Sequence, residues 1–578
     1  MNWPVSNSIA AGIFLTLSFA SAEPKADIIL HRGKVVTVDK QFAIREAVAI
    51  TGDRIIAVGT DEQVLRFRGE RTKMVDLAGK MVLPGLMDSH THPTGAALHE
   101  FDHPIPTMDS IADVLDYIRA RARTLPEGQW ILLSQVFITR LREQRYPTRA
   151  EMDAAAPKHP VLFRTGPDAA LNSLALKLSG IDRDFKVSDG GTGFIEKDPK
   201  TGEPTGVLRN CSRFVKSQSP GRSANEKQRQ EALRELLHDY NSVGLTTIAD
   251  RDASSGGIAL FKKLRATNQL TVRVVFSQGI SNLGPIAKIQ DSIRAVAEDP
   301  LFKEKDPWLR IIGIKTYLDG GMLTGSAYMR EPWGVSEMYG ISDPKYRGVL
   351  FITPERLLPM VRTAAESGLQ FTAHTVGDGA VHALLDAYET VAKDLPIRAT
   401  RPCITHCNFM SAEAITRMAK LGAVADIQPA WLYQDTRTLV KQFGQARLRY
   451  FQPLKSCFDA GVIVGGGSDH MQKIGSLRAN NPYNPFLGMA TAIGRKAKGY
   501  DGSLHPEEAL TREQAIRFYT INNAHLLFRE TELGSIELGK LADLIVIDRD
   551  LLTCAEADIV GTQVQRTYVG GQLVFEKK

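Results

Sequence analysis

The chain has 578 residues, of which 43% are hydrophobic and 24% are charged. This is an ordinary globular composition, and the length allows a large core and more than one domain. The formal net charge of +6 is small for this length, and there is no Lys/Arg run that would follow a phosphate backbone. We therefore expect no nucleic-acid partner.

Residues 1–22 have the pattern of an export signal. Ile9–Ala20 is an apolar stretch, and Ala20-Ser21-Ala22 is a small-x-small cleavage pattern. The segment before the apolar stretch carries no Lys or Arg, so a buried N-terminal helix is the alternative. We expect cleavage near Ala22 and a periplasmic or secreted protein that has no membrane attachment after export.

Short strand patterns at both ends of the chain predict one small β domain. Turn residues separate the strands, which cover residues 27–30, 34–38, 47–51, 54–58, 74–76, 541–547, 565–569 and 572–575. Two β segments at opposite ends of a chain most economically pair with each other. We therefore expect residues 23–80 and 530–578 to form a composite domain.

The middle of the chain alternates short apolar strands with helical patterns. Expected strands are 81–92, 245–250, 271–277, 309–318, 370–374, 403–406, 423–428 and 462–469. Expected helices are 225–243, 353–367, 379–393, 411–421, 447–460 and 511–528, the last with a capping box at Thr511 and Gln514. Eight apolar strands predict a closed parallel α/β barrel from residues 81–94 and 225–529.

Residues 95–224 are too long for a simple crossover between the first two barrel strands. They hold a helical pattern at 110–125, a strand at 130–133 and a strand-helix pair at 161–164 and 171–179. We expect an inserted α/β subdomain that leaves the carboxyl end of the first strand and overhangs the active face. It is either a lid or pocket wall, or an elaboration with no catalytic contact.

Two histidines end the first barrel strand. His90 and His92 are two residues apart, so both rings project from one face of an extended strand. Two imidazoles on one face suit a divalent metal such as zinc. The alternative is a pair of exposed loop histidines.

Lys315 is a charged residue in the apolar strand 309–318. Strict alternation puts Ile311 and Lys315 on the lumen face and Ile312 on the face that packs against helices. A buried lysine is costly unless it is paired or modified. Its neutral amine can take up carbon dioxide as a carbamate that bridges metals, and the alternative is an ion pair with Asp319.

Three more candidate ligands end later strands: His374, His406 and Asp469. Alternation places His406 in the lumen and turns Cys403 and Cys407 toward the helices. A glycine run precedes Asp469 and lets backbone approach the site. Together, four histidines, one lysine and one aspartate at strand ends predict a metal centre.

These motifs resemble those of the amidohydrolase superfamily. The resemblance lies in His90-Thr-His92, Lys315 in Ile-Lys-Thr-Tyr-Leu-Asp-Gly-Gly, His374 in His-Thr-Val-Gly-Asp-Gly-Ala-Val, His406, and Ser468-Asp469. Asn172-Ser173-x-Ala175-Leu176 and the tail 533–548 are similar to amidohydrolase family 3, which includes N-substituted formamide deformylase-like enzymes. The resemblance implies a distorted (β/α)8 TIM barrel with a flanking β-sandwich built from both chain ends.

The resemblance also implies a centre of one or two metals, usually Zn2+, with another divalent metal as the alternative. In it, His90, His92 and Asp469 bind one ion, His374 and His406 bind the second, and carbamylated Lys315 bridges them. Asp319 and Asp378 are expected to orient ligands. This chain has Pro167 where the family often has histidine, and His470 where a small residue is common. We expect both departures, together with Asn172, at the substrate pocket.

The ligand set predicts hydrolysis of a C–N bond in a small molecule, of the non-peptide amide or N-formyl type. A metal-bound hydroxide attacks the carbonyl, and Asp469 acts as general base and then as general acid. The alternatives are a deaminase- or lactamase-like hydrolase, or an exported regulatory or binding protein with a vestigial site. The oligomeric state is open, with a homodimer as one candidate.

Overall fold

The structure is a computed structural model that describes residues 25–134, 136–218 and 221–578. The predicted signal peptide at residues 1–22 lies outside the described residues. Among the described helices, none combines the length and the apolar character that crossing a membrane requires.

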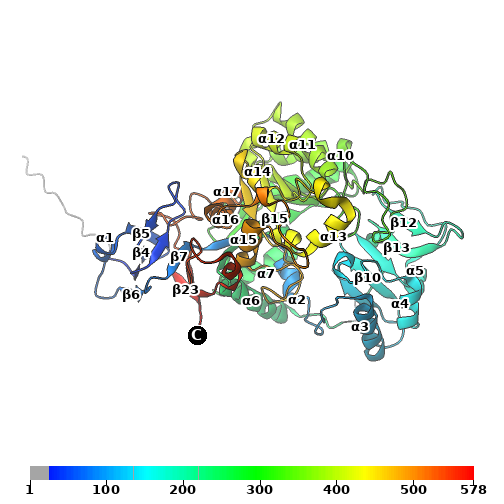
Figure 1. Cartoon of the computed structure of the whole chain (residues 1–578), viewed down its shortest axis with the longest axis horizontal. Coiled ribbons are helices and arrows are strands. Elements are labelled where there is room, and N and C mark those ends of the chain that lie inside the picture. Colours follow the sequence, from blue (N-terminus) through cyan, green and yellow to red (C-terminus); the bar gives the residue numbers. More distant parts are fainter. Residues whose placement is uncertain (1–24, 135, 219–220) are drawn as a thin grey trace, which may run out of the picture.

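Eight parallel strands form the centre of the molecule (Figure 1). They stand side by side in chain order: β8 (Leu86–Thr91), β14 (Leu245–Ala253), β15 (Arg273–Gly279), β16 (Leu309–Tyr317), β17 (Gln370–Thr375), β18 (Cys403–His406), β19 (Val424–Ile427) and β20 (Val464–Gly466). A parallel bridge between Thr91 and His470 brings the first strand to the last. The predicted α/β barrel is confirmed as a nearly closed TIM-like barrel.

Amphipathic helices cover the barrel and pack their apolar faces on the strands. They include α6 (Glu226–Ser242), α7 (Ser255–Ala266), α8 (Ile286–Glu298), α10 (Pro354–Glu366), α11 (Asp378–Ala392) and α12 (Ala412–Leu421). The capping box of Thr511 and Gln514 is present, but it opens a short helix, α16 (Arg512–Phe518). A second helix, α17 (Ile521–Leu526), replaces the rest of the long helix that was expected over 511–528.

The helix expected over 447–460 is wrong in its extent. The longer α13 (Pro429–Arg447) ends at the first residue of this range, and α14 (Leu454–Asp459) is the only helix that lies wholly within it. Gly444 breaks α13 with a left-handed φ of 72°. The helical segment was missed because Pro429 directly follows the predicted strand and polar residues interrupt the apolar pattern.

The strand expected over 81–92 is two strands. β7 (Met81–Pro84) pairs in the composite sheet, and β8 belongs to the barrel. Gly85 separates them, and a Cβ at this position would lie 2.1 Å from the hydroxyl oxygen of Thr246. Only glycine lets the chain pass this close to β14 as it leaves one sheet for the other.

Both chain ends form the β-sandwich, at one end of the molecule in Figure 1. One sheet has the order β5-β4-β1-β6, from Arg54–Gly59, Ala47–Thr51, Ile28–His31 and Lys73–Asp76. The other has the order β23-β22-β21-β7-β2-β3, which adds Gln572–Glu576, Val564–Val569, Leu544–Ile547, Lys34–Val36 and Ile44–Arg45. Leu30 and Val48 of the first sheet share a core with Val82 and Leu544 of the second.

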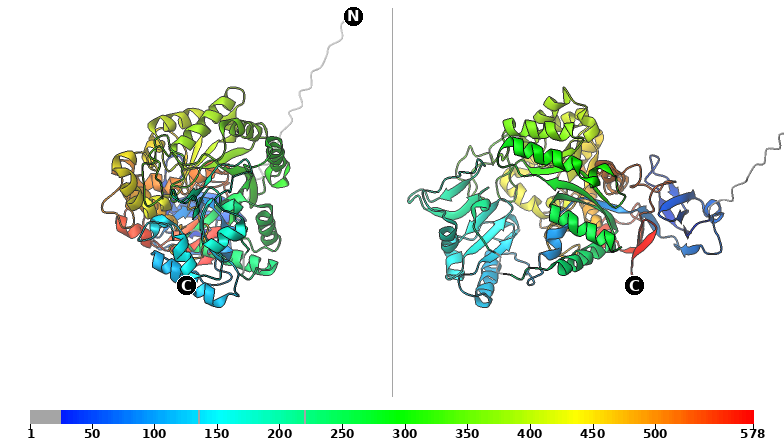
Figure 2. Two further views of the ribbon diagram at one scale, coloured as in Figure 1. Left: turned by 90° about the vertical axis from the view of Figure 1, so that its right-hand side faces the viewer. Right: turned by 180° about the vertical axis from the view of Figure 1, so that it is seen from behind.

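The inserted segment forms a third unit on the opposite side of the barrel from the sandwich (Figure 1). Its sheet has the order β12-β13-β11-β10-β9, from Phe194–Lys197, Pro204–Arg209, Asp168–Leu171, Val161–Thr165 and Ile131–Ser134. The helices are α3 (Ile111–Thr124), α4 (Arg149–Ala155) and α5 (Ser173–Ser179). Viewed from that side, the subdomain lies in front of the barrel (left view of Figure 2).

Candidate metal centre

All six predicted ligands line one cavity of about 370 Å³ at the carboxyl ends of the barrel strands. They are His90, His92, Lys315, His374, His406 and Asp469. This is the end at which parallel barrels of this kind carry their active sites.

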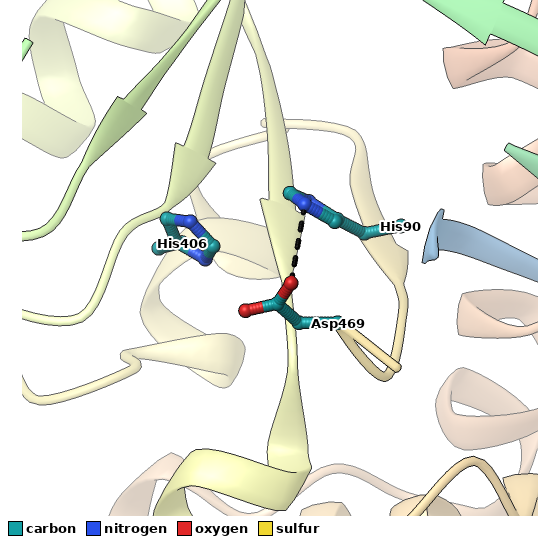
Figure 3. Close-up of side chains that lie close together, drawn as sticks. All are labelled: His90, His406 and Asp469. Atoms are coloured by element: carbon teal, nitrogen blue, oxygen red, sulfur yellow. Dashed lines mark ion pairs between the residues drawn. The ribbon is translucent and has the colours of Figure 1, made fainter. Parts of the chain in front are cut away.

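The rings of the His-x-His pair face the carboxylate of Asp469. The Nε2 atoms of His90 and His92 are 3.3 Å apart. One carboxylate oxygen of Asp469 lies 3.4 Å from His90 Nε2 and 3.2 Å from His92 Nε2. Figure 3 shows His406 beside His90 and Asp469, and ligand atoms of these three residues all lie within 4.8 Å of one another. These three form a buried His/His/Asp group that could hold a metal ion.

His406 reaches the cavity through its backbone conformation. Regular alternation in β18 turns Cys403 and Thr405 into the barrel, where Thr405 hydrogen-bonds to Thr372 across 2.6 Å. The expectation that Cys403 faces the helices is therefore wrong, and only Cys407 has that orientation. His406 has a φ of 77°, which turns its ring back toward the lumen. Such a left-handed conformation is strained in a residue other than glycine and is typical of functional sites.

A bulge decides which way Lys315 points. The register between β15 and β16 shifts between Phe276 and Ser277 and leaves Ile312 unpaired. Ile312 packs inside the barrel and Ile311 in the outer core, the reverse of the expected faces. Beyond the bulge Lys315 lines the cavity, as predicted. A bulge re-aims side chains in this way because it adds one residue to one strand.

Lys315 is only 1% exposed, and burial lowers the pKa of its amine. Its Nζ lies 4.8 Å from the centre of the Tyr317 ring. Among the described residues, no carboxylate oxygen lies within 4 Å of this amine, so the alternative of an ion pair with Asp319 is not found. A buried, unpaired amine is the form that can react with carbon dioxide.

The remaining histidines are neutral because they are buried. Burial and the nearby charge of Lys315 lower the pKa of His374 to about 3, and burial also lowers the pKa of His406. Their ring centres are 4.5 Å apart. Neutral imidazoles present lone pairs to the cavity, and metal ligation requires this form.

Two residues that the sequence reasoning missed fix the histidine tautomers. Asp426 accepts a hydrogen bond from His90 Nδ1 at 2.9 Å, and Gln428 accepts one from His406 Nδ1 at 2.7 Å. With Nδ1 protonated, both Nε2 atoms offer lone pairs to the cavity. The Nε2 atoms of His90 and His406 and the carboxylate of Asp469 all present lone pairs, so this group fits a divalent metal ion.

Asp469 is held in a strained turn after β20. The φ of Asp469 is 56°, and its backbone N–H donates to the His90 carbonyl at 2.8 Å. The side-chain amide of Asn481 donates to the backbone carbonyl of Asp469. Asp88 accepts the N–H of Ser468 next to it. Burial would raise the pKa of Asp469, but the neighbouring histidines hold the pKa below its ordinary value. The carboxylate is therefore fixed in place and ionised.

The two residues expected to orient ligands contact backbone instead. The Asp319 carboxylate accepts three backbone N–H groups, those of Tyr328, Val376 and Gly377. It thereby ties the loop after β16 to the loop after β17 and lines the cavity. Asp378 is the first residue of α11, and its carboxylate accepts the backbone N–H of Arg330.

Asn172 and His470, both expected at the substrate pocket, do not line the cavity. Asn172 caps α5 and accepts the backbone N–H groups of Val161 and Ala175. The Nδ1 of His470 lies 2.7 Å from the Tyr240 hydroxyl, and its Nε2 contacts the carbonyls after it. Pro167, which replaces a family histidine, does line the cavity.

Much of the cavity wall is apolar, and the inserted subdomain supplies part of it. Apolar side chains on the wall are Phe137, Met322, Leu323, Val376, Trp431 and Met471. Phe137, Thr165, Gly166 and Pro167 come from the insertion. These four residues place part of the insertion in the wall of the cavity.

A model of the amidohydrolase family matches residues 73–575. The chain is a member of the amidohydrolase family. Within it the chain falls in family 3, as its motifs predicted, and it is a metal-dependent hydrolase that acts on carbon–nitrogen bonds.

Three similar proteins span almost the whole amidohydrolase chain. N-substituted formamide deformylase of Arthrobacter pascens is 31% identical over 565 residues, which cover 95% of this chain and 98% of that one. An uncharacterized metal-dependent hydrolase from Pyrococcus horikoshii OT3 superposes with a TM-score of 0.64 at 20% identity, covering 92% and 99%. Atrazine chlorohydrolase TrzN from Arthrobacter aurescens TC1, complexed with zinc, gives 0.50 at 16% identity, covering 95% of each chain.

Proposed function

We propose that this amidohydrolase hydrolyses an N-formyl compound or another small non-peptide amide. The observation that carries the proposal is the convergence of six ligand-type side chains on one cavity with an apolar wall. The similarity to an N-substituted formamide deformylase over nearly the whole chain supports the choice of bond. A small acyl group at the ligands and an apolar nitrogen substituent against the wall would fill such a cavity.

The ligand set is suited to one or two zinc ions. His90, His92 and Asp469 would hold one ion, His374 and His406 the second, and carbamylated Lys315 would lie between them. When bound, zinc supplies a Lewis acid that polarises a carbonyl and lowers the pKa of water. The zinc complex of a structurally similar chlorohydrolase supports this choice of metal.

Lys315 and Asp469 have separate chemical roles in the proposal. The neutral amine of Lys315 adds to carbon dioxide, forms a C–N bond and releases one proton, which leaves a carbamate anion. The carboxylate of Asp469 takes a proton from the attacking water and delivers it to the nitrogen that leaves. The hydrogen bonds of Asp426 and Gln428 keep His90 and His406 in the orientation that this arrangement needs.

A substrate panel tests the proposal on the zinc-loaded protein. It contains N-formyl amines, aryl amides, lactams and aminated heterocycles, and product formation is followed for each. We expect N-formyl compounds or small amides to be hydrolysed, with release of formate or the acid. Turnover of only the heterocycles or lactams would favour the deaminase- or lactamase-like alternative, and no turnover with metal bound would favour the vestigial site.

Two variants test the assigned residues. His92→Ala and Asp469→Ala should abolish hydrolysis while the circular dichroism spectrum and the elution volume of the protein stay unchanged. Retained turnover in purified Asp469→Ala would refute its role as the proton carrier.

Export is a separate proposal that is supported by the sequence of residues 1–22. We propose a periplasmic or secreted mature protein that begins after Ala22. N-terminal sequencing of the protein from its native host tests this, and an intact Met1 would contradict it.

A further inference from the structure

A second cavity of about 390 Å³ adjoins the metal cavity, and Phe137 lines both. Its wall comes from the segment 105–109, the turn that contains Arg140, helix α13 and the loop 472–480. It therefore lies where the inserted subdomain meets the barrel. None of the predicted metal ligands lines it.

Cationic side chains dominate this second cavity. Five line it, whereas a single carboxylate, that of Asp109, does so; the five are Arg140, Arg437, Lys473, Arg478 and Lys498. Cations that share a small cavity repel one another unless anions compensate them.

Protein carboxylates compensate only two of the five cations. Arg140 pairs with Asp435 at 3.0 Å, and Arg478 pairs with Glu100 at 2.9 Å. For the other three, no carboxylate oxygen lies within 4 Å in the part of the chain that the structure describes. These three are Arg437, Lys473 and Lys498.

Lys473 is the decisive residue because it is buried. Its exposed fraction is 5%, and its ammonium has one hydrogen bond among the described residues, a long one of 3.5 Å to the Pro106 carbonyl. The backbone holds it there with a left-handed φ of 62°. Burying an ammonium without a counter-charge is expensive. The fold therefore places a cation that no described carboxylate contacts directly in the wall of a cavity large enough for a ligand.

We propose that this cavity binds a small oxyanion, with Lys473 as its inner ligand and Arg437 and Lys498 at its rim. The oxyanion is either a free ion or a carboxylate at the far end of a substrate, because the two cavities meet at Phe137. The guanidinium of Arg140 stacks on Phe137 at 4.8 Å and on Trp431 at 5.4 Å, and both rings line the metal cavity. Phe137 therefore separates the two cavities, and the charged Arg140 stacks on it from the side of the second cavity.

Calorimetric titration of the metal-loaded protein with inorganic phosphate at fixed ionic strength tests the free-ion form. We expect saturable binding that Lys473→Met weakens at least about tenfold, the effect of losing roughly 1.4 kcal/mol of interaction. Arg437→Gln, at an exposed position, should weaken phosphate binding in the same direction. Asp109→Asn removes the one lining carboxylate and should tighten it.

Lys393→Met, a charge loss at an exposed site outside the cavity, is the matched control and should leave the affinity unchanged. If phosphate binds at the metal centre instead, its affinity should be unchanged in Lys473→Met and Arg437→Gln. The two variants therefore distinguish the two sites. Wild-type affinity in both variants, together with no change in Asp109→Asn, would overturn the free-ion form.

The substrate form is tested with a matched pair of N-formyl amines, one of which ends in a carboxylate; this arm rests on the proposed function. We expect the carboxylate to raise kcat/KM in the wild type but not in Lys473→Met. If neither substrate turns over, the proposed function fails and the phosphate titration still decides the site. If phosphate binding and the carboxylate effect are both insensitive to Lys473→Met, the proposal is wrong.

Discussion

The carboxylate of Asp426 lies 2.9 Å from Nδ1 of His90, and both side chains are completely buried. The other carboxylate oxygen accepts hydrogen bonds from Ser89 at 2.7 Å and from the Gln428 amide at 2.9 Å. Gln428 in turn accepts from His406. Asp426 in β19 and Gln428 directly after it therefore form one hydrogen-bonded pair. This pair orients two histidines that come from different strands.

Removing the Asp426 carboxylate should weaken metal binding more than it weakens the fold. In Asp426→Asn the ring of His90 loses its charged acceptor, and we expect zinc affinity to fall about 10- to 100-fold. Competition with a chromogenic chelator measures this. Asp378→Asn is the control, because that carboxylate contacts the backbone of Arg330 and should not change the affinity. Wild-type affinity in Asp426→Asn would contradict the account of His90.

Gly467 is predicted to set the distance between β20 and the His-x-His strand. A Cβ there would lie 2.9 Å from the His90 backbone nitrogen and 3.0 Å from the His90 Cβ. Gly467→Ala should therefore displace His90 and lower both zinc affinity and activity. Gly256→Ala is the matched control, because a Cβ at Gly256 meets nothing within 4 Å and α7 tolerates it. Equal metal affinity in the two variants would show that this close approach is unimportant.

His99 should make the fold sensitive to acid. Burial and the charge of Lys473 lower the pKa of His99 from 6.5 to about 4. The unfolded chain binds the proton near 6.5 and the folded chain only near 4, so the stabilisation is complete above pH 6.5. It is lost as the pH falls toward 4, by up to about 3 kcal/mol.

His99→Phe should flatten this part of the pH profile. The free energy of unfolding, measured by urea denaturation of chelator-treated protein at pH 4.5 and 7.5, should differ less in the variant than in the wild type. An unchanged difference between the two pH values would contradict the assignment to His99.

Phe137 is expected to select for the size of the nitrogen substituent. It is buried in the wall of the metal cavity, and Phe137→Ala would remove apolar surface that contacts a large substituent but not a small one. KM should therefore rise more for an N-formyl amine with a large apolar group than for N-methylformamide, with kcat little changed. A rise of equal size for both substrates would place Phe137 outside the substrate site.

Much of the barrel can be predicted from the sequence, because strands that are buried on both faces appear as short apolar runs. The sequence predicts the barrel strand 403–406 residue for residue, and likewise the sandwich strand 47–51. What strict alternation could not supply is the bulge at Ile312 and the left-handed turn at His406, which exchange inward and outward faces. These depend on packing between strands that are distant in the sequence.

The missed site residues did leave a signal. Asp426 and Gln428 are polar residues in an otherwise apolar strand, and a buried polar side chain must have a partner. Alternation puts both on one face of the strand that pairs with β18, the strand of His406. Asn172 carried a different signal, because Asn before an apolar helical run is the pattern of an N-cap, and this is what it forms.

The central claim is that six side chains from the ends of five barrel strands meet at one metal centre. Crystals of the full chain grown with zinc, with diffraction measured on both sides of the zinc absorption edge, test it most directly. The account predicts anomalous density for one or two ions in contact with His90, His92, His374, His406, Asp469 and a carbamylated Lys315. No anomalous density in this cavity, or zinc bound only at other residues, would contradict it.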